Sequence, residues 1–166
     1  MKGRAVANPK KFYSARNYKL EDSVGYLLRM LTQQVSREVE RRMAEHGLTD
    51  AQWKPLLFIR QGRGETAADL SRSTCIDTGA VTRMLDRLED KTLVRRVRSE
   101  QDRRVVKLEL TKEGLRLADE VVPEVLSGVL NETLVGFSAA EYEQFKSLLQ
   151  RALENVRKMD EEGAAS

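Results

Sequence analysis

Residues 77–114 read DTGAVTRMLDRLEDKTLVRRVRSEQDRRVVKLELTKEG. The stretch opens with a polar helix that carries one narrow apolar stripe, and Asp77 is a good N-cap for that helix. Two short strands follow over residues 93–98 and 105–110, joined by a turn over residues 99–103. A surface helix beside a basic hairpin fits duplex DNA, because the helix can enter the major groove while the hairpin tip reaches the minor groove. The sequence therefore favours a DNA-binding regulator over an enzyme.

Capping residues mark the helices that come before this stretch. Thr49 and Gln52 have the spacing of a capping box, which predicts a helix in which Pro55 should cause a local bend. Thr66 and Asp69 repeat that spacing and predict a short third helix. The third helix, the turn after it and the helix that opens the quoted stretch together predict a helix-turn-helix.

Long amphipathic helices are expected on both sides of this unit. The first should run over about residues 21–45, and a fifth helix, capped by Thr111, should be kinked by Pro123. Ser138 and Glu141 open a sixth helix. The apolar faces of these helices are wider than a small winged helix can cover, so we predict a two-fold dimer through the terminal helices; a monomeric bundle in which they fold back is the alternative. The apolar positions are Val24, Leu27, Leu28, Leu31, Val35, Val39 and Met43, then Leu115, Ala118, Val121, Val122, Val125, Leu126, Val129 and Leu130, then Tyr142, Phe145, Leu148, Leu149, Ala152, Leu153 and Val156.

The predicted fold is mainly α, of the α+β kind: a winged helix-turn-helix domain with long N- and C-terminal helices that form a dimerisation bundle. A chain of 166 residues has room for one such domain with helical extensions. The expected divisions are a flexible basic arm over residues 1–19, an N-terminal dimerisation and core helix over 20–48, the DNA-binding lobe over 49–110, C-terminal dimerisation helices over 111–160 and a frayed tail over 161–166.

Positive charge is concentrated in two regions of a chain whose formal net charge is only +3. Residues 1–19 contain six basic and no acidic residues, and residues 83–107 contain nine basic and five acidic ones. Residues 111–166 contain six basic and eleven acidic residues. A polyanion such as DNA should therefore be attracted to the middle and the N-terminus of the chain and repelled from its C-terminal helices.

The cellular compartment is predicted from what the sequence lacks. A single cysteine, Cys75, excludes an internal disulfide and fits a reducing environment. No apolar run approaches the about 20 residues needed to span a bilayer, and the basic N-terminus lacks the apolar segment of a secretory signal. We therefore expect a cytoplasmic protein that has no membrane partner.

Two motifs make the sequence resemble the MarR family of winged-helix transcription regulators. The first is D-x-R-x-x-x-x-x-L-T-x-x-G, whose fixed positions here are Asp102, Arg104, Leu110, Thr111 and Gly114. The second is D-x-G-A-x-T-R-M-L-D-R-L over residues 77–88. The resemblance covers about residues 20–160 and implies an obligate dimer, a pseudo-palindromic operator in double-stranded DNA and repression that a small ligand relieves. Family members usually have glycine at the position of Thr92, where threonine resists a positive φ, so a distorted helix end or a different cap is expected there.

The residues expected to contact DNA lie on the third helix, the fourth helix and the hairpin. Arg104 should insert into a narrow minor groove, and Asp102 should hold a guanidinium by paired hydrogen bonds, as the family pattern also implies; a plain surface turn is the alternative. Arg83 could form two parallel hydrogen bonds with the edge of a guanine. Asp86 is expected to pair with Arg83 or Arg87, which would give one of these arginines a structural role. Hydroxyl groups on the third helix should contact phosphates. The full set is Thr66, Ser71, Ser73, Thr78, Gly79, Ala80, Thr82, Arg83, Arg87, Arg98, Asp102, Arg103 and Arg104.

A ligand site is expected on the first two helices, because the inducer pocket of relatives lies between the dimer helices and the DNA-reading lobe. An arginine next to aromatic residues suits a small aromatic carboxylate. Trp53 and Met30 are explained equally well as core residues. The candidate ligand-binding residues are Tyr26, Arg29, Met30, Gln52, Trp53 and Leu57.

Other chemistries have less support in the sequence. Cys75 suggests thiol-based redox sensing, but peroxide-sensing relatives carry the reactive thiol in the first helix, and a lone cysteine in a turn is usually a small buried hydrophobe. His46 has no second His or Cys with which to hold a metal. We find no glycine-rich phosphate loop and no nucleophile–base pair, so neither a catalytic residue nor a cofactor is expected. A winged helix used for protein–protein contact remains the alternative to a DNA-binding regulator.

Overall fold

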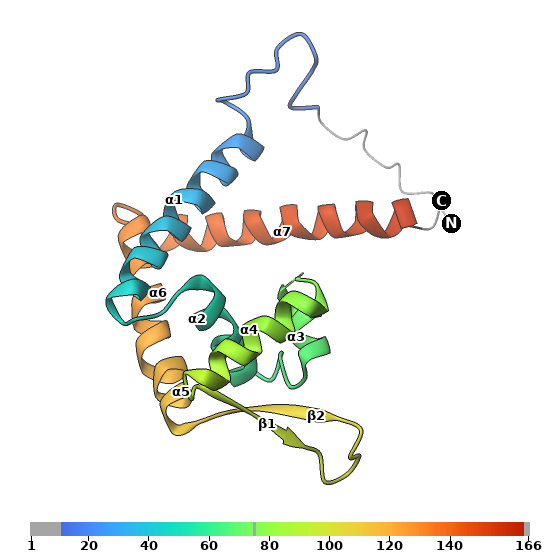
Figure 1. Cartoon of the computed structure of the whole chain (residues 1–166). Helices are drawn as coiled ribbons and strands as arrows, with labels where there is room; N and C mark the ends of the chain where they lie inside the picture. Colours follow the sequence, from blue (N-terminus) through green and yellow to red (C-terminus); the bar gives the residue numbers. More distant parts are fainter. Residues whose placement is uncertain (1–10, 75, 165–166) are drawn as a thin grey trace.

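The computed structural model describes residues 11–74 and 76–164, and this part of the chain consists of helices and a two-stranded antiparallel sheet (Figure 1). The predicted winged helix-turn-helix architecture is confirmed. Within the described residues, no helix has the length and apolar character required to cross a membrane. The elements are, in order, α1 (Val24–Glu45), α2 (Asp50–Arg60), α3 (Ala67–Thr74), α4 (Thr78–Asp90), β1 (Val94–Arg98), β2 (Val106–Leu110), α5 (Lys112–Arg116), the π-helix η1 (Leu117–Val121), α6 (Val122–Thr133) and α7 (Ala139–Ala164).

Side-chain caps set the starts of the two helices of the helix-turn-helix. Oδ1 of Asp77 accepts a hydrogen bond from the backbone N–H of Ala80 at 3.0 Å, so α4 begins where the sequence predicted. At the start of α3, the N–H of Thr66 donates to Oδ2 of Asp69 at 2.9 Å, and the N–H of Asp69 donates to Oγ1 of Thr66 at 3.2 Å. This is the predicted capping box, and it fixes α3 from local sequence alone.

Helix α1 is shorter at its start than the sequence predicted. It begins at Val24, because Ser23 is the N-cap and its Oγ accepts from the N–H of Tyr26 at 3.2 Å. The N–H of Val24 donates to the hydroxyl oxygen of Tyr13 at 2.9 Å. The segment before α1 therefore supplies part of the cap of that helix.

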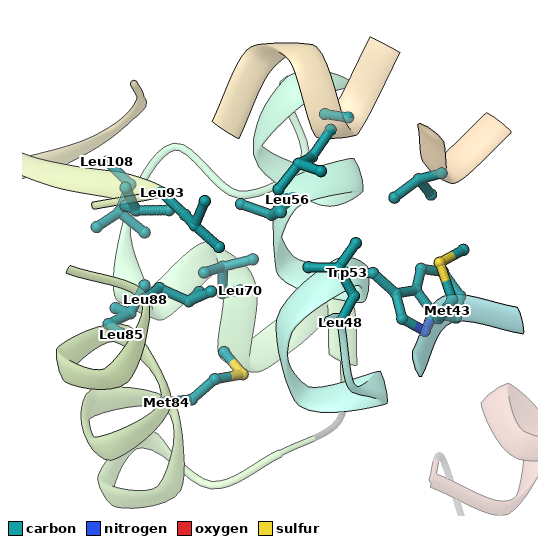
Figure 2. Close-up of a cluster of buried hydrophobic side chains, with 14 of the residues drawn as sticks. Met43, Leu48, Trp53, Leu56, Leu70, Met84, Leu85, Leu88, Leu93 and Leu108 are labelled. Atoms are coloured by element: carbon teal, nitrogen blue, oxygen red, sulfur yellow. The ribbon is translucent and has the colours of Figure 1, made fainter. Parts of the chain in front are cut away.

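The core lies where α1 to α4 meet the base of the sheet (Figure 2). Met43, Leu56 and Leu70 come from α1, α2 and α3 and are completely buried. Burying a side chain of this kind contributes roughly 1.5–3 kcal/mol. The predicted stripe of α4 is buried as well, which leaves the opposite face of that helix turned to solvent. That stripe is Val81, Met84, Leu85 and Leu88.

The β1–β2 hairpin, here called the wing, pairs with Val94 opposite Leu110. Each strand begins one residue later than predicted. Leu108 is buried, and its N–H donates to the carbonyl oxygen of Glu65 at 2.8 Å, which fixes β2 to the loop before α3. Val106, at the start of β2, is 42% exposed, because the hairpin there extends beyond the core towards its tip (Figure 1).

The predicted fifth helix is interrupted and forms α5, η1 and α6. In this segment the N–H of Val122 donates to the carbonyl oxygen of Leu117, five residues earlier, which widens the helical turn. Pro123 follows directly and has no N–H to donate, so the interruption lies where the sequence predicted a kink. Two burial predictions in this segment are wrong: Leu117 is buried although the periodic pattern omits it, and Leu115, which the pattern includes, is exposed. The reason is that Gly114 packs closely against the carbonyl of Leu93, and Leu117, three residues later, lies on the same face of the helix.

An ion-pair network fixes α1 to α6. Nη1 and Nη2 of Arg42 donate to the two carboxylate oxygens of Glu132 at 2.9 and 2.5 Å. Glu38 accepts hydrogen bonds from Arg41 and from Arg42, and these bonds lower the pKa of Glu38 to about 2. The carboxylate of Glu38 is therefore ionised at neutral pH, and the network orients α1 on α6.

Two apolar faces remain uncovered in a single chain. Helix α7 projects away from the rest of the molecule (Figure 1), and Leu148, Leu153 and Val156 on it are exposed. At the start of α1, Val24 and Leu27 are exposed as well. In the single chain, the terminal helices therefore do not cover these faces by folding back over one another.

Helix α4 ends in a left-handed residue that is not glycine. Thr92 has a φ of 58°. Its N–H donates to the carbonyl oxygen of Glu89 at 2.8 Å, and the N–H of Leu93 donates to that of Leu88 at 2.9 Å, which is the hydrogen-bond pattern of a Schellman motif. The expectation of a distorted helix end or a different cap is wrong, because threonine adopts the conformation that glycine would take.

We therefore expect Thr92→Gly to raise the free energy of unfolding by about 1 kcal/mol. A β-branched residue is strained at positive φ, and glycine removes that strain, although the greater freedom of glycine in the unfolded chain offsets part of the gain. Chemical denaturation measures the change. Thr92→Ala keeps the Cβ atom and serves as the control, for which little gain is expected. A glycine variant less stable than the parent would contradict this account of the helix end.

Candidate nucleic-acid interface

The solvent-facing side of α4 carries most of the side chains that the sequence assigned to the major groove. Thr78, Thr82, Arg83 and Arg87 are exposed there, opposite the buried stripe. Gly79 is exposed, and a Cβ atom there would lie 3.2 Å from Oδ1 of the capping residue Asp77 and 3.9 Å from Nη1 of Arg83. This face combines the guanidinium groups of two arginines with small and hydroxyl-bearing residues, a composition that permits close approach to base edges.

The ion pairing predicted for this face is wrong. Asp86 pairs with neither arginine of α4; its Oδ1 accepts from Nη1 of Arg96 on β1 at 2.8 Å. Within residues 11–74 and 76–164, neither Arg83 nor Arg87 forms an ion pair. Both guanidinium groups are therefore open to a ligand, and neither is committed to holding the helix together.

The tip of the wing is built by two hydrogen bonds that backbone N–H groups donate to Asp102. Oδ1 of Asp102 accepts from the backbone N–H of Arg104 at 2.9 Å, and the N–H of Val105 donates to the carbonyl oxygen of Asp102, also at 2.9 Å. The expected pairing of Asp102 with a guanidinium does not form among the described residues, because its side chain closes the turn instead. Arg103 and Arg104 are consequently presented at the tip as exposed side chains.

The hydroxyl groups assigned to phosphate contacts are already engaged. Oγ1 of Thr66 donates to Asp69 at 2.7 Å within the capping box. Ser71 Oγ donates to the carbonyl oxygen of Ile76 at 2.6 Å, and Ser73 Oγ donates to that of Arg63 at 2.8 Å. A phosphate could take these donors only by displacing bonds that hold α3 and its flanking turns. Their observed role is structural.

The two faces of the wing differ in whether their arginines form ion pairs. Arg95 pairs with Glu109 across the strands at 2.6 Å, whereas Arg98, on the other face, is exposed and forms no ion pair with any described residue. In Figure 1 the wing extends beneath α4, far from the start of α1 and on the opposite side of the molecule from α7. The unpaired cations of α4 and the wing therefore belong to one end of the molecule.

The six candidate ligand-binding residues do not come together within one chain. Trp53 is buried beside Met43 in α1 (Figure 2), and its Nε1 donates to Asp50 at 2.9 Å. Tyr26, Arg29 and Met30 lie near the other end of α1; at 1.5 Å per residue, Met30 is about 20 Å from Met43. The guanidinium of Arg29 lies over the ring of Tyr26 at 5.5 Å, so these two at least are neighbours. The remaining candidates have structural partners: Gln52 accepts from Thr49, and Leu57 packs against the core.

Metal and redox sites gain no support. Among the described residues there is no cluster of three or more His, Cys, Asp or Glu side chains that could hold a metal ion. His46 is the C-cap residue of α1. Cys75, on which the redox alternative depends, lies outside the described residues.

Comparison with known proteins identifies the family. The model of the MarR family matches residues 48–106, which include α2, α3, α4 and β1. The multiple antibiotic resistance protein MarR of Escherichia coli (strain K12) is 31% identical over 130 residues, which cover 78% of this chain and 90% of that protein. This chain belongs to the MarR family. The organic hydroperoxide resistance transcriptional regulator of Bacillus subtilis (strain 168) is a further relative, 28% identical over 140 residues, 83% of this chain and 92% of that protein.

Solved structures of MarR-family proteins share the fold. A MarR mutant from E. coli in which a cysteine is replaced by serine, complexed with operator DNA, has a TM-score of 0.68 at 31% identity and covers 78% of this chain and 93% of that chain. BpsR of Bordetella bronchiseptica, whose DNA binding is regulated by 6-hydroxynicotinic acid, has a TM-score of 0.68 at 28% identity and covers 81% of this chain and 96% of that chain. The chain is thus a MarR-family, winged-helix transcription regulator and not an enzyme.

Sequence reasoning missed one group of residues at this interface. Arg96 on β1 contacts both Asp86 and Glu89 on α4. The spacing of Asp86 and Glu89, three residues apart on one helix, is the only signal of this cluster in the sequence, and it favours partners on the same helix over a partner on β1. The pairing is visible only once the fold brings β1 alongside α4.

Proposed function

We propose that this MarR-family chain is a homodimeric, sequence-specific repressor that places α4 in the major groove and the wing in the adjacent minor groove of operator DNA. The observation that carries the proposal is the position of five exposed arginines at one end of the molecule, none of which forms an ion pair with a described residue. Unpaired guanidinium groups on a helix and a hairpin suit phosphate, guanine and minor-groove contacts together. The five are Arg83, Arg87, Arg98, Arg103 and Arg104.

A mobility-shift assay tests the proposal. DNA from upstream of the gene is compared with a scrambled duplex at two salt concentrations. We expect sequence preference and a steep loss of affinity with salt, because each neutralised phosphate contributes about 0.9 to the slope of log affinity against log salt. A chain that shifts neither duplex would instead be a winged helix used for protein–protein contact.

The uncovered faces of α1 and α7 support a dimer. Side chains such as Leu148 and Leu153 are exposed in one chain, and apolar faces of this length are stabilised by burial against a second copy. A cavity of about 760 Å³ between α1, α6 and α7 is lined by Leu31, Phe137 and Phe145 among others, and it continues the same apolar surface. A two-fold arrangement would place two α4 helices about 34 Å apart, one turn of DNA.

The double variant Leu148→Glu with Leu153→Glu is expected to convert the dimer into monomers at micromolar concentration. Both side chains are exposed in the single chain, so the substitutions spare the fold of the monomer but bury charge in a dimer interface. Sedimentation velocity measures the oligomer. The matched control is Gln144→Glu with Gln150→Glu, which adds the same charge to exposed positions of α7 outside the apolar face and should remain dimeric. Equal behaviour of the two variants would contradict a dimer through α7.

We further propose that a small aromatic acid releases the repressor from DNA. Support comes from BpsR, whose DNA binding 6-hydroxynicotinic acid regulates, and from the stacking of Arg29 on Tyr26, which pairs a cation with an aromatic surface. Because Tyr26 and Arg29 lie far from Trp53 in one chain, a site that uses all the candidates would need both chains of the dimer. Thermal-shift titration with 6-hydroxynicotinic acid and with benzoic acid tests binding, and Arg29→Ala should abolish any shift.

A further inference from the structure

Arg96 connects the wing to the DNA-reading helix through several bonds at once. Its Nη1 donates to Oδ1 of Asp86 at 2.8 Å and also to Glu89, both on α4. The backbone N–H of Arg96 donates to Oε1 of Glu89 at 2.9 Å, and Nη2 reaches the carbonyl oxygen of Thr82 at 3.4 Å. Main chain and side chain of one β1 residue are thus fixed to three residues of α4.

The side chains in this clamp are only partly withdrawn from water. The side chains of Arg96 and Glu89 are 29% and 32% exposed, and that of Asp86 is 54% exposed. Ion pairs with this degree of exposure add little to global stability, because solvent screens them. The effect that remains is directional, since several bonds to one guanidinium restrict the angle between β1 and α4.

The wing needs such a restriction because its tip lies far from its support. The other strand is fixed at Leu108, which lies opposite Arg96 in the sheet, by the bond from the Leu108 N–H to the carbonyl oxygen of Glu65, and the tip at Arg104 lies beyond both attachments. A strand extends by about 3.3 Å per residue, so the three residues from Arg96 to the start of the turn at Ser99 span about 10 Å. A rotation of about 20° at the clamp would then move the far end of the strand by about 3 Å, which is enough to take a guanidinium out of hydrogen-bond reach.

We propose that Arg96 is a positioning residue for operator recognition: it fixes the spacing between the major-groove contacts of α4 and the minor-groove contact of the wing. It contacts no base in this role and acts through Arg104 and the α4 arginines. The inference rests on the proposed mode of DNA binding. The ion pairs of Arg96 with Asp86 and Glu89 would then keep the major-groove and minor-groove contacts at a fixed distance from each other.

The test compares Arg96→Met with Arg95→Met as dimers on operator DNA. Both variants remove one positive charge from β1 and keep a long side chain, but Arg95 pairs with Glu109 on the opposite face of the wing and makes no bond to α4. We expect Arg96→Met to weaken operator binding by about 10-fold and to lose hydroxyl-radical protection in the flanking minor groove, while dimethyl sulfate protection of major-groove guanines and the melting temperature are retained. Arg95→Met should keep both protections.

A second variant, Glu89→Gln, removes the partner carboxylate and leaves Arg96 in place, so it should reproduce the selective loss of minor-groove protection in a milder form. Retention of minor-groove protection by Arg96→Met, or equal loss of both protections, would overturn the positioning role. If the unmutated protein protected neither groove, the proposed function itself would be overturned. This outcome is distinguishable from a failure of the positioning role, because it is measured on the unmutated protein.

Discussion

Replacing Arg104 by alanine is expected to weaken operator binding by about 10-fold or more without changing the oligomeric state. Contacts of this kind are worth about 1–3 kcal/mol, and 1.4 kcal/mol corresponds to a factor of ten. The guanidinium of Arg104 is exposed and forms no ion pair with a described residue, and only its backbone N–H is used in the turn, where it donates to Asp102. The substitution therefore removes the proposed DNA contact and leaves the wing intact. Fluorescence anisotropy with a labelled operator measures affinity, and sedimentation velocity measures the oligomer.

Arg95→Ala is the matched control for this prediction. It removes the same charge from the same hairpin, but Arg95 is committed to Glu109 at 2.6 Å. A loss caused by general electrostatics would be similar in both variants and would vanish at high salt. A loss specific to Arg104 should persist relative to the control and should be largest for operators whose flanks have a narrow minor groove. Equal losses would remove Arg104 from the recognition mechanism.

Gly114→Ala is expected to lower the free energy of unfolding by about 3 kcal/mol. A Cβ atom at Gly114 would lie 2.0 Å from the carbonyl oxygen of Leu93 and 3.0 Å from its carbonyl carbon, and backbone atoms cannot move aside as a flexible side chain can. The same carbonyl accepts the N–H of Thr111 at 3.1 Å, so α5 cannot shift away from β1 without losing that bond. Urea denaturation monitored by circular dichroism measures the loss.

Gly25→Ala is the control, because nothing lies within 4 Å of a Cβ atom at Gly25 and the residue lies in α1. Alanine is the better helix former, so this variant should match the parent or exceed it by up to about 1 kcal/mol. A Gly114 variant as stable as the parent would show that close approach of α5 to β1 is not what requires glycine at the end of the L-T-x-x-G motif.

These two substitutions separate the halves of the motif by which the sequence resembles its family. Leu110, Thr111 and Gly114 form the packed joint between wing and α5, where Oγ1 of Thr111 accepts from the N–H of Gly114 at 3.1 Å. Asp102 and Arg104 form the tip. The first group is expected to act on stability and the second on DNA binding. A sequence motif alone does not distinguish these roles, because both kinds of residue stand at fixed spacing.

Features that depend on a few adjacent residues were predictable from the sequence. The cap of α4 at Asp77, the capping box of Thr66 with Asp69 and the buried stripe of α4 all follow from side chains within one or two helical turns. The conformation of Thr92 was predicted wrongly, although it too is local. Threonine rarely adopts a positive φ, but the hydrogen bonds at the end of α4 hold Thr92 in that conformation.

Features that depend on contacts between distant residues were not predictable. Close packing of Gly114 against the carbonyl of Leu93 places Leu117 on the core face and leaves Leu115 exposed, and this contact joins residues about twenty positions apart. Asp86 forms its ion pair with Arg96 on β1, ten residues away in the sequence. The apolar stripe of α4 predicted that Arg83 and Arg87 lie off the core face, and both are exposed. That Asp86 pairs with neither of them follows only from the fold, which brings Arg96 alongside α4.

The most direct test of the central claim is the composition of the complex that the full chain forms with its own upstream DNA. Sedimentation velocity with a short duplex that contains the preferred site measures how many chains bind per duplex. We expect two chains per duplex, with protected half-sites about one helical turn apart on the DNA. A chain that stays monomeric, or that binds every duplex equally with no preferred site, would contradict the account.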